Sequence, residues 1–218
     1  MSGSVRPFVP GSVRFGAWAI GVGVVQFVVA MAVVQSRYPG YSLLTNYISD
    51  LGNTATSPWH AVFNGSIMLL GALAFVGILA AWGGFPAGGS RLAGLGLLLL
   101  ASLSAILVGV FPENVNPTVH GIVSLTVFAP GGVGLVLAGA GMRPTTHWSG
   151  YGGASMLLGL ITLASLAYYV PTQFANSTFD PGLIERLIVA PILLWALLVA
   201  VHLGRLPVRP RIRRPRTG

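Results

Sequence analysis

Length, composition and charge exclude most kinds of soluble protein. The chain has 218 residues, of which 54% are hydrophobic and 7% are charged, and its mean hydropathy is +0.79. In an ordinary soluble domain about a quarter of the residues are charged. There is no cysteine, which excludes disulfides, thiolate catalysis and cysteine-based metal sites. These values indicate an integral membrane protein.

The apolar residues form six long segments. A helix needs roughly 20 apolar residues to cross a hydrocarbon core about 30 Å thick. Long segments rich in Leu, Ala, Gly and Val favour helices over barrel strands, because a helix pairs its backbone amides internally. We therefore predict an all-α fold, one bundle of six transmembrane helices in a single domain over residues 1–218. The predicted spans lie near residues 15–35, 61–82, 92–111, 119–141, 151–171 and 184–204.

The charged residues are sorted between the two ends of these spans. All four acidic residues, Asp50, Glu113, Asp180 and Glu185, lie in or beside the first, third and fifth connections. An excess of arginine marks the cytoplasmic side, so the pattern predicts a cell-membrane protein with both termini in the cytoplasm. Ten of the twelve basic residues lie at the N-terminus, in the second and fourth connections, or after the last span: Arg6, Arg14, Arg91, Arg143, Arg205, Arg209, Arg211, Arg213, Arg214 and Arg216.

A basic tail follows the last span. Six arginines crowd into residues 205–216, and they supply much of the net charge of +8. Basic segments beside a membrane attract anionic headgroups. The predicted partners of the cytoplasmic tail at residues 205–218 are therefore the bilayer and its anionic lipids, and not nucleic acid.

The first, third and fifth connections each end with a helix-starting signal. A capping residue precedes proline in Ser57-Pro58, Asn116-Pro117 and Asp180-Pro181. The capping side chain accepts a free backbone amide hydrogen, and proline at the first helical position loses no needed donor. We expect the second, fourth and sixth spans to begin at these prolines.

Ionisable groups follow each of these signals. His60, His120 and Glu185 lie two, three and four residues after their prolines. Ionisable residues within a span are costly unless they face a protein interior or water, so they indicate a functional site. The sequence predicts an outward-facing polar pocket at this end of the bundle. Its candidate ligand-binding residues are Asn46, Ser49, Asp50, Glu113, His120, Glu185 and Arg186.

The same residues allow a catalytic interpretation. Asp50, His60, Glu113 and His120 are candidates either for a mixed nitrogen and oxygen metal site, with zinc as the expected ion, or for acid and base catalysis. The spacing matches no known ligand motif. A membrane-embedded hydrolase or transferase acting on a lipid-type substrate is therefore an alternative function.

A transporter or accessory membrane subunit is a further alternative. Pro130-Gly131-Gly132 is expected to break or kink the fourth span near its middle, and Pro191 the sixth. The span interiors contain no carboxylate at mid-depth, and Gln26 and Asn64 are the main polar candidates there. A transporter would need a continuous polar path past these two side chains.

Two stretches resemble the signature of a known family. The first runs from Tyr41 to Gly52 and contains Ser-Asp-Leu-Gly, and the second joins Gly109-Val110-Phe111-Pro112-Glu113 to His120-Gly121. Together they resemble domain of unknown function 998, a family of multi-pass membrane proteins of bacteria and archaea. The resemblance extends over nearly the whole chain and implies six spans. It draws attention to Ser49, Asp50, Glu113 and His120 without implying roles for them.

The leading hypothesis is a multi-pass membrane protein whose polar pocket binds a ligand, a lipid headgroup or a partner. Convergence of the histidines with Asp50 and Glu113 to ligand distance would favour the enzyme.

Overall fold

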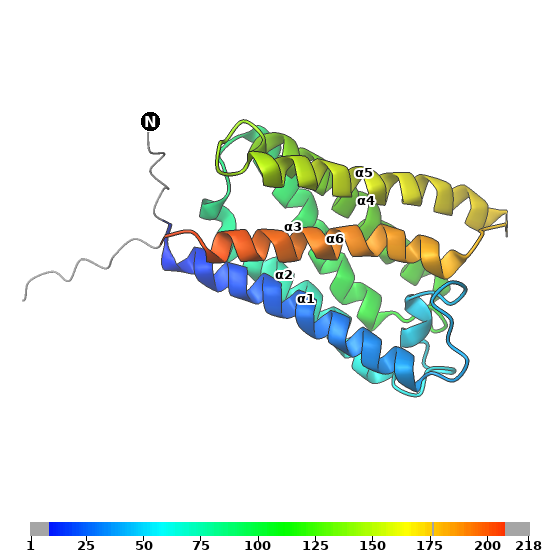
Figure 1. The fold of residues 1–218 in the computed structure, drawn as a ribbon. Helices are drawn as coiled ribbons and strands as arrows, with labels where there is room; N and C mark the ends of the chain where they lie inside the picture. Colours follow the sequence, from blue (N-terminus) through cyan, green and yellow to red (C-terminus); the bar gives the residue numbers. More distant parts are fainter. Residues whose placement is uncertain (1–8, 176, 208–218) are drawn as a thin grey trace, which may run out of the picture.

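The computed structural model describes residues 9–175 and 177–207, which form a bundle of six long helices (Figure 1). All six are long and apolar enough to cross a membrane, and the described residues contain no β-strand. The predicted all-α fold with six spans is confirmed. The helices are α1 (Gly11–Arg37), α2 (His60–Ala81), α3 (Gly89–Val110), α4 (Pro117–Met142), α5 (Ser149–Phe174) and α6 (Pro181–Gly204), with short 3-10 helices η1 (Ser49–Gly52) and η2 (Trp82–Gly84).

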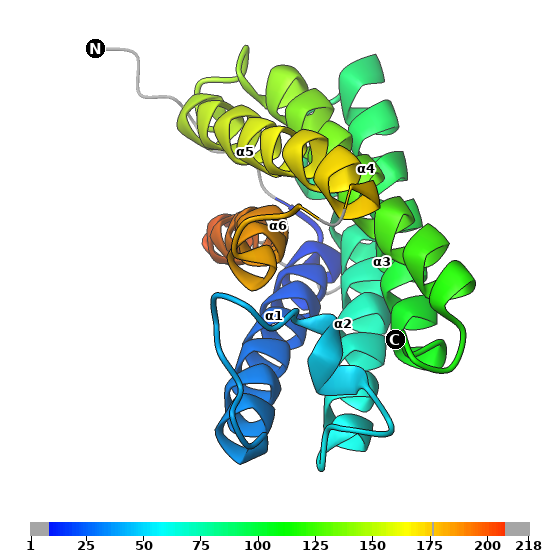
Figure 2. The ribbon, with the colours of Figure 1, turned by 90° about the vertical axis from the view of Figure 1, so that its right-hand side faces the viewer.

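The helices form a closed ring. Each packs against the next in the chain, and α6 also packs along α1 (Figure 2). Because successive helices are antiparallel, the start of α1 and the end of α6 lie together, and the amide of Val9 donates to the carbonyl of Pro207 at 2.9 Å. Most of the tail predicted at residues 205–218 lies outside the described residues.

The two ends of the ring carry different charges. We call the end with the η1, α3–α4 and α5–α6 connections the acidic end, because Asp50, Glu113, Asp180 and Glu185 lie there, together with Arg37 and Arg186. The opposite end is called the arginine end. Its described charged residues are Arg14, Arg91, Arg143 and Arg205.

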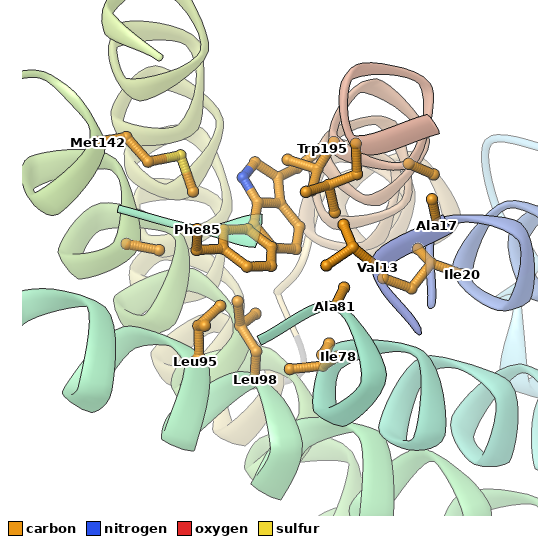
Figure 3. Packing of buried hydrophobic residues seen from close by; sticks show 14 of the residues in the cluster. Val13, Ala17, Ile20, Ile78, Ala81, Phe85, Leu95, Leu98, Met142 and Trp195 are labelled. Carbon is orange, nitrogen blue, oxygen red and sulfur yellow. The ribbon is translucent and has the colours of Figure 1, made fainter. Parts of the chain in front are cut away.

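The main hydrophobic core lies toward the arginine end. Figure 3 shows side chains of α1, α2, α3 and α6 packed around Phe85 and Trp195. Several contacts there need glycine: a Cβ on Gly94 would lie 2.5 Å from the backbone nitrogen of Ala138, and one on Gly16 would lie 2.4 Å from the carbonyl oxygen of Gly77. Small residues allow membrane helices to approach this closely. The core thus fixes α3 against α4 and α1 against α2.

The outer faces of the helices are also apolar. Trp18 and Leu92 are both 62% exposed, and Ile122 is 61% exposed. A helix that is hydrophobic on all sides belongs in a large core or a membrane. These faces fit contact with lipid chains.

The three predicted helix starts have three outcomes. At α4 the Asn116 side chain accepts from the amide of Val119 at 3.1 Å, which confirms that start. Helix α6 begins at Pro181, but the Asp180 side chain makes no capping bond and its φ is 42°. The predicted start of the second span at Pro58 is wrong, since α2 begins at His60.

Local hydrogen bonding explains the later start of α2. The Asn53 side-chain oxygen accepts from the amides of Ala55 and Thr56, and the Asn53 carbonyl accepts from the amide of Ser57. Asparagine in such a turn competes with helical hydrogen bonding. The chain therefore turns until Trp59.

The fourth and sixth spans are not broken at their prolines, so of the predicted break or kink the break is wrong. Helix α4 runs without interruption through Pro130-Gly131-Gly132, and α6 through Pro191. Membrane helices tolerate proline where neighbouring groups compensate for the lost hydrogen bond. Gly131 and Gly132 are close-packing positions, against Ile192 and Leu163 respectively.

Candidate functional site

A partly open apolar cavity lies between the helices. Its volume is about 130 Å³, which is roughly ten times the ~10–15 Å³ that one water requires. Five helices and η1 line it, and α5 does not. The apolar lining includes Phe27, Phe63, Ile67, Leu70, Ala74, Leu98, Ala101, Ala105, Val127, Phe128, Val189, Ile192 and Trp195.

The cavity is long for its volume. Lining residues extend from Glu185 to Ala196 along α6 and from Phe63 to Ile78 along α2. At 1.5 Å of rise per residue, these stretches measure roughly 16 and 22 Å. The space is therefore a narrow channel parallel to the helices, and it begins under η1 at the acidic end.

Ser49, His120 and Glu185 line the acidic end of this channel, and Ser124 lies on the lining one turn of α4 beyond His120. Glu185 is 7% exposed, and its Oε2 accepts a short hydrogen bond from the amide of Ile48. His120 Nδ1 lies 2.8 Å from the carbonyl oxygen of Phe111. A carbonyl can only accept, so Nδ1 carries the hydrogen and Nε2 of the neutral ring is an acceptor.

Two more carboxyl groups lie in the loops above the channel. The Asn53 amide donates to Glu113 Oε1 at 3.3 Å, and Glu113 also interacts with the side chains of Ser49 and Asp50. Burial raises the pKa of Glu113 above its ordinary value, the Ser49 hydrogen bond opposes that change, and the neighbouring carboxyl of Asp50 adds to it. Asp50 itself accepts from the Asn46 side chain and from the amide of Tyr47, each at 2.9 Å.

The loop after α1 is fastened to the start of α6, as Figure 2 illustrates. The Arg186 guanidinium donates to the carbonyl of Asn46 at 3.0 Å and to the hydroxyl of Tyr41 at 2.7 Å. Tyr41 in turn donates to the carbonyl of Tyr47 at 2.7 Å. Burial raises the pKa of Tyr41 to about 12, although its contact with Arg186 works in the opposite direction. The loop therefore has a defined position above the cavity.

A glycine makes this close contact possible. A Cβ on Gly182 would lie 2.2 Å from the carbonyl oxygen of Asn46, and the amide of Leu183 donates to the carbonyl of Leu44 at 3.1 Å. Any side chain at residue 182 would push the loop away from α6.

The predicted site residues thus separate into groups. Ser49, His120 and Glu185 lie on the cavity, whereas Asp50 and Glu113 interact above it. Asn46 and Arg186 belong to the loop contact with α6. These two residues support the position of the loop and do not line the cavity.

His60 does not join these groups. It lies at the first position of α2, half-exposed, does not line the cavity, and forms no side-chain hydrogen bond with the described residues. Within residues 9–175 and 177–207, no three His, Asp or Glu side chains are grouped as metal ligands. The four-residue zinc set of His60, His120, Asp50 and Glu113 is therefore not assembled in this structure.

The polar residues considered for transport have local partners. Gln26 donates to the carbonyls of Gly23 and Ser66, each at 2.9 Å, and Asn64 donates to the carbonyl of Gly52 at 3.0 Å. Neither residue lines the cavity. Both side chains instead connect parts of the chain, with Gln26 joining α1 to α2.

The cavity was missed by sequence reasoning. Its walls are ordinary apolar residues, and only the ring arrangement separates those that face the cavity from those that face lipid. Small residues on facing helices could have indicated the cavity: Gly71 and Ala74 on α2, and Ala101 and Ala105 on α3.

Fold and site together define a multi-pass membrane protein of six helices, five of which line an apolar cavity. Comparison with protein families then identifies the group. The family described as "Protein of unknown function (DUF998)" matches residues 21–202, and the chain belongs to this family. The match extends from the middle of α1 to the end of α6, and it confirms the resemblance seen in the sequence. No curated protein and no solved structure matches the chain.

Proposed function

We propose that this protein binds a single-chain amphiphile in its cavity, with the alkyl chain between the helices and the head group at Ser49, His120 and Glu185. The observation that carries the proposal is the combination of a long apolar channel with polar groups at one end. Ligand pockets are commonly apolar with a few placed polar groups, and that is the arrangement here.

The shape of the cavity supports an alkyl chain. A volume of about 130 Å³, lined along the Glu185–Ala196 stretch of α6, suits an elongated ligand. A flexible hydrocarbon chain can follow such a channel and contact Phe63, Leu98 and Ile192 along its length.

The lining also argues against a water-filled channel. Buried water needs about 2–4 polar partners, and apolar cavities of comparable size stay dry and take up apolar molecules. Below Ser124 the only polar side chains on the lining are Ser102 and the Trp195 indole. The hydroxyl of Ser102 donates to the carbonyl of Leu98 at 2.8 Å, and the indole of Trp195 donates to Ser155 at 2.7 Å.

The proposal is tested by extracting the protein from its membrane and measuring bound amphiphiles by native mass spectrometry. Ala105 lies on the cavity wall of α3 and is 7% exposed. Ala105→Phe should fill the channel and remove the bound molecule. Ala93→Phe adds the same side chain to an exposed position on α3 and should leave the bound molecule in place.

Equal amounts of amphiphile in both variants would contradict the proposal. Ala101→Phe, from a neighbouring wall position, provides a second filling variant with the same expected loss. Thermal unfolding of each variant shows whether it is folded. A lost ligand in a stable Ala105→Phe protein is the supporting result.

We also propose that the arginine end faces the cytoplasm and the acidic end faces outward in a cell membrane. The excess of arginine at one end supports this orientation. The native chain has no cysteine, so a single introduced cysteine is the only thiol that can react. Ala55→Cys at the acidic end should react with an impermeant reagent added outside cells, and Thr146→Cys at the arginine end should not. The reverse pattern would contradict the orientation.

A further inference from the structure

The polar end of the cavity also indicates the chemistry of the head group. We infer that the cavity selects an amphiphile whose head donates hydrogen bonds and carries a positive charge, of which a long-chain primary amine is the simplest example. The inference rests on the proposed function and adds the class of ligand.

The polar groups on the lining present acceptors. His120 uses its Nδ1 hydrogen on the carbonyl of Phe111, which leaves the Nε2 lone pair. The Ser49 side chain interacts with Glu113, and its hydroxyl oxygen has lone pairs that can accept. Of the two Glu185 oxygens, only Oε2 receives a hydrogen bond from the described residues, from the amide of Ile48. A head group rich in donors satisfies all three side chains.

The local charge favours a cation. Glu185 lines the cavity, and Glu113 and Asp50 lie close above it. The nearby basic residue, Arg186, directs its guanidinium to the carbonyls of Asn46 and Gly182 and to the hydroxyl of Tyr41, not to these carboxyl groups. Arg186 also acts electrostatically on Glu185. An ammonium group would stabilise the ionised form of Glu185, whereas a fatty acid would place its carboxylate beside the carboxyl groups of Glu185, Glu113 and Asp50 and would bind more weakly.

Trp195 provides a direct probe of occupancy. It lines the cavity ten residues along α6 from Glu185, which is roughly 15 Å at 1.5 Å per residue. Dodecylamine, dodecanol and dodecanoate, each with bromine at the chain end, are titrated into the full-length protein in phosphatidylcholine nanodiscs. Saturable quenching that disappears in Trp195→Phe measures binding in the cavity and excludes quenching of the lipid-facing tryptophans.

The bromine-tipped amine should bind most tightly, then the alcohol, and the carboxylate most weakly. Glu185→Gln retains an acceptor for the amide of Ile48 but removes the charge, and it should weaken amine binding roughly 10- to 100-fold, as expected for a charge-assisted hydrogen bond. His120→Asn retains a donor for the carbonyl of Phe111 and removes the Nε2 acceptor, so it should also weaken the amine. Asp180→Asn removes a carboxylate from the same end but away from the cavity, and it should bind like the wild type.

The possible outcomes separate the two proposals. No saturable quenching by any of the three chains would overturn both the proposed function and this inference. Saturable binding with the carboxylate as tight as the amine, or an amine affinity that does not change in Glu185→Gln, would overturn the inference alone. Selective amine binding that is lost in Glu185→Gln and kept in Asp180→Asn supports it.

Discussion

The two ends of the bundle are held together in different ways. At the arginine end, α1, α2, α3, α4 and α6 meet in a core of interlocking apolar side chains and glycine contacts. At the acidic end, hydrogen bonds from loop residues such as Tyr41, Asn53 and Asn114 tie the connections together above a cavity. The acidic end also has a smaller buried cluster around Phe27, Leu51 and Phe63. The comparison shows that the larger core closes the arginine end, whereas hydrogen-bonded loops and a smaller core cover the cavity at the acidic end.

The largest effect should come from breaking the packed end. Gly94→Ala places a Cβ 2.5 Å from the backbone of Ala138, and overpacking against backbone atoms should cost about 3 kcal/mol of unfolding free energy. Gly96 is on the same helix with open space beside it, so Gly96→Ala should stabilise the protein by about 0.5–1 kcal/mol. Thermal unfolding in detergent measures both. Equal effects of the two changes would contradict the packing of α3 on α4.

Weakening the loop after α1 should cause local opening more than global unfolding. Tyr41→Phe removes the hydrogen bonds to Arg186 and to the carbonyl of Tyr47, at a cost of about 1–2 kcal/mol. Because the loop can move while the packed end stays intact, proteolysis of the loop should increase much more than global unfolding. Limited proteolysis of folded protein measures this. An unchanged cleavage rate would show that Tyr41 does not hold the loop.

The residues that precede α4 and α6 should contribute differently to stability. Asn116→Ala removes a capping bond to the amide of Val119 and should cost about 1 kcal/mol. Asp180 makes no such bond and has a φ of 42°, so Asp180→Gly should leave stability unchanged or raise it by at most about 1 kcal/mol. Unfolding curves of both variants provide the test. A loss in Asp180→Gly as large as in Asn116→Ala would contradict the geometry of α6.

The smallest effect should be a dependence on pH at the acidic end. The pKa of Glu113 is raised in the folded protein, so the folded state binds its proton more tightly than the unfolded state. The contribution of Glu113 to stability is therefore complete below its ordinary pKa of 4.5 and is lost as pH rises through the raised value. Glu113→Gln should therefore reduce the fall of the unfolding midpoint as pH rises above about 4.5. If the unfolding midpoint of Glu113→Gln depended on pH as steeply as that of the wild type, another group would be responsible for the pH dependence.

The fold could be predicted because lipid constrains it strongly. Six apolar segments such as residues 15–35 must form helices when no water can pair the backbone. The start of α4 followed from Asn116-Pro117 because a cap depends only on neighbouring residues. The start of α2 could not be predicted from Ser57-Pro58, because Asn53 forms a competing turn that these two residues do not reveal.

The site could be predicted only in part. Sequence placed Ser49, His120 and Glu185 at one end of the bundle, and the structure gathers them on one cavity. It also suggested His60, which lies off the cavity because side-chain direction depends on the rotation of α2. The contact between Arg186 and Tyr41 joins residues 145 positions apart, and no local pattern specifies such a contact.

The most direct test is an experimental density map of the protein purified from its own membrane. If an amphiphile occupies the cavity, we expect elongated density from the Glu185 carboxyl toward Trp195, with a polar head within hydrogen-bond distance of Glu185 and His120. A channel closed by the side chains of Phe63, Leu98 and Ile192, with no density between them, would contradict it.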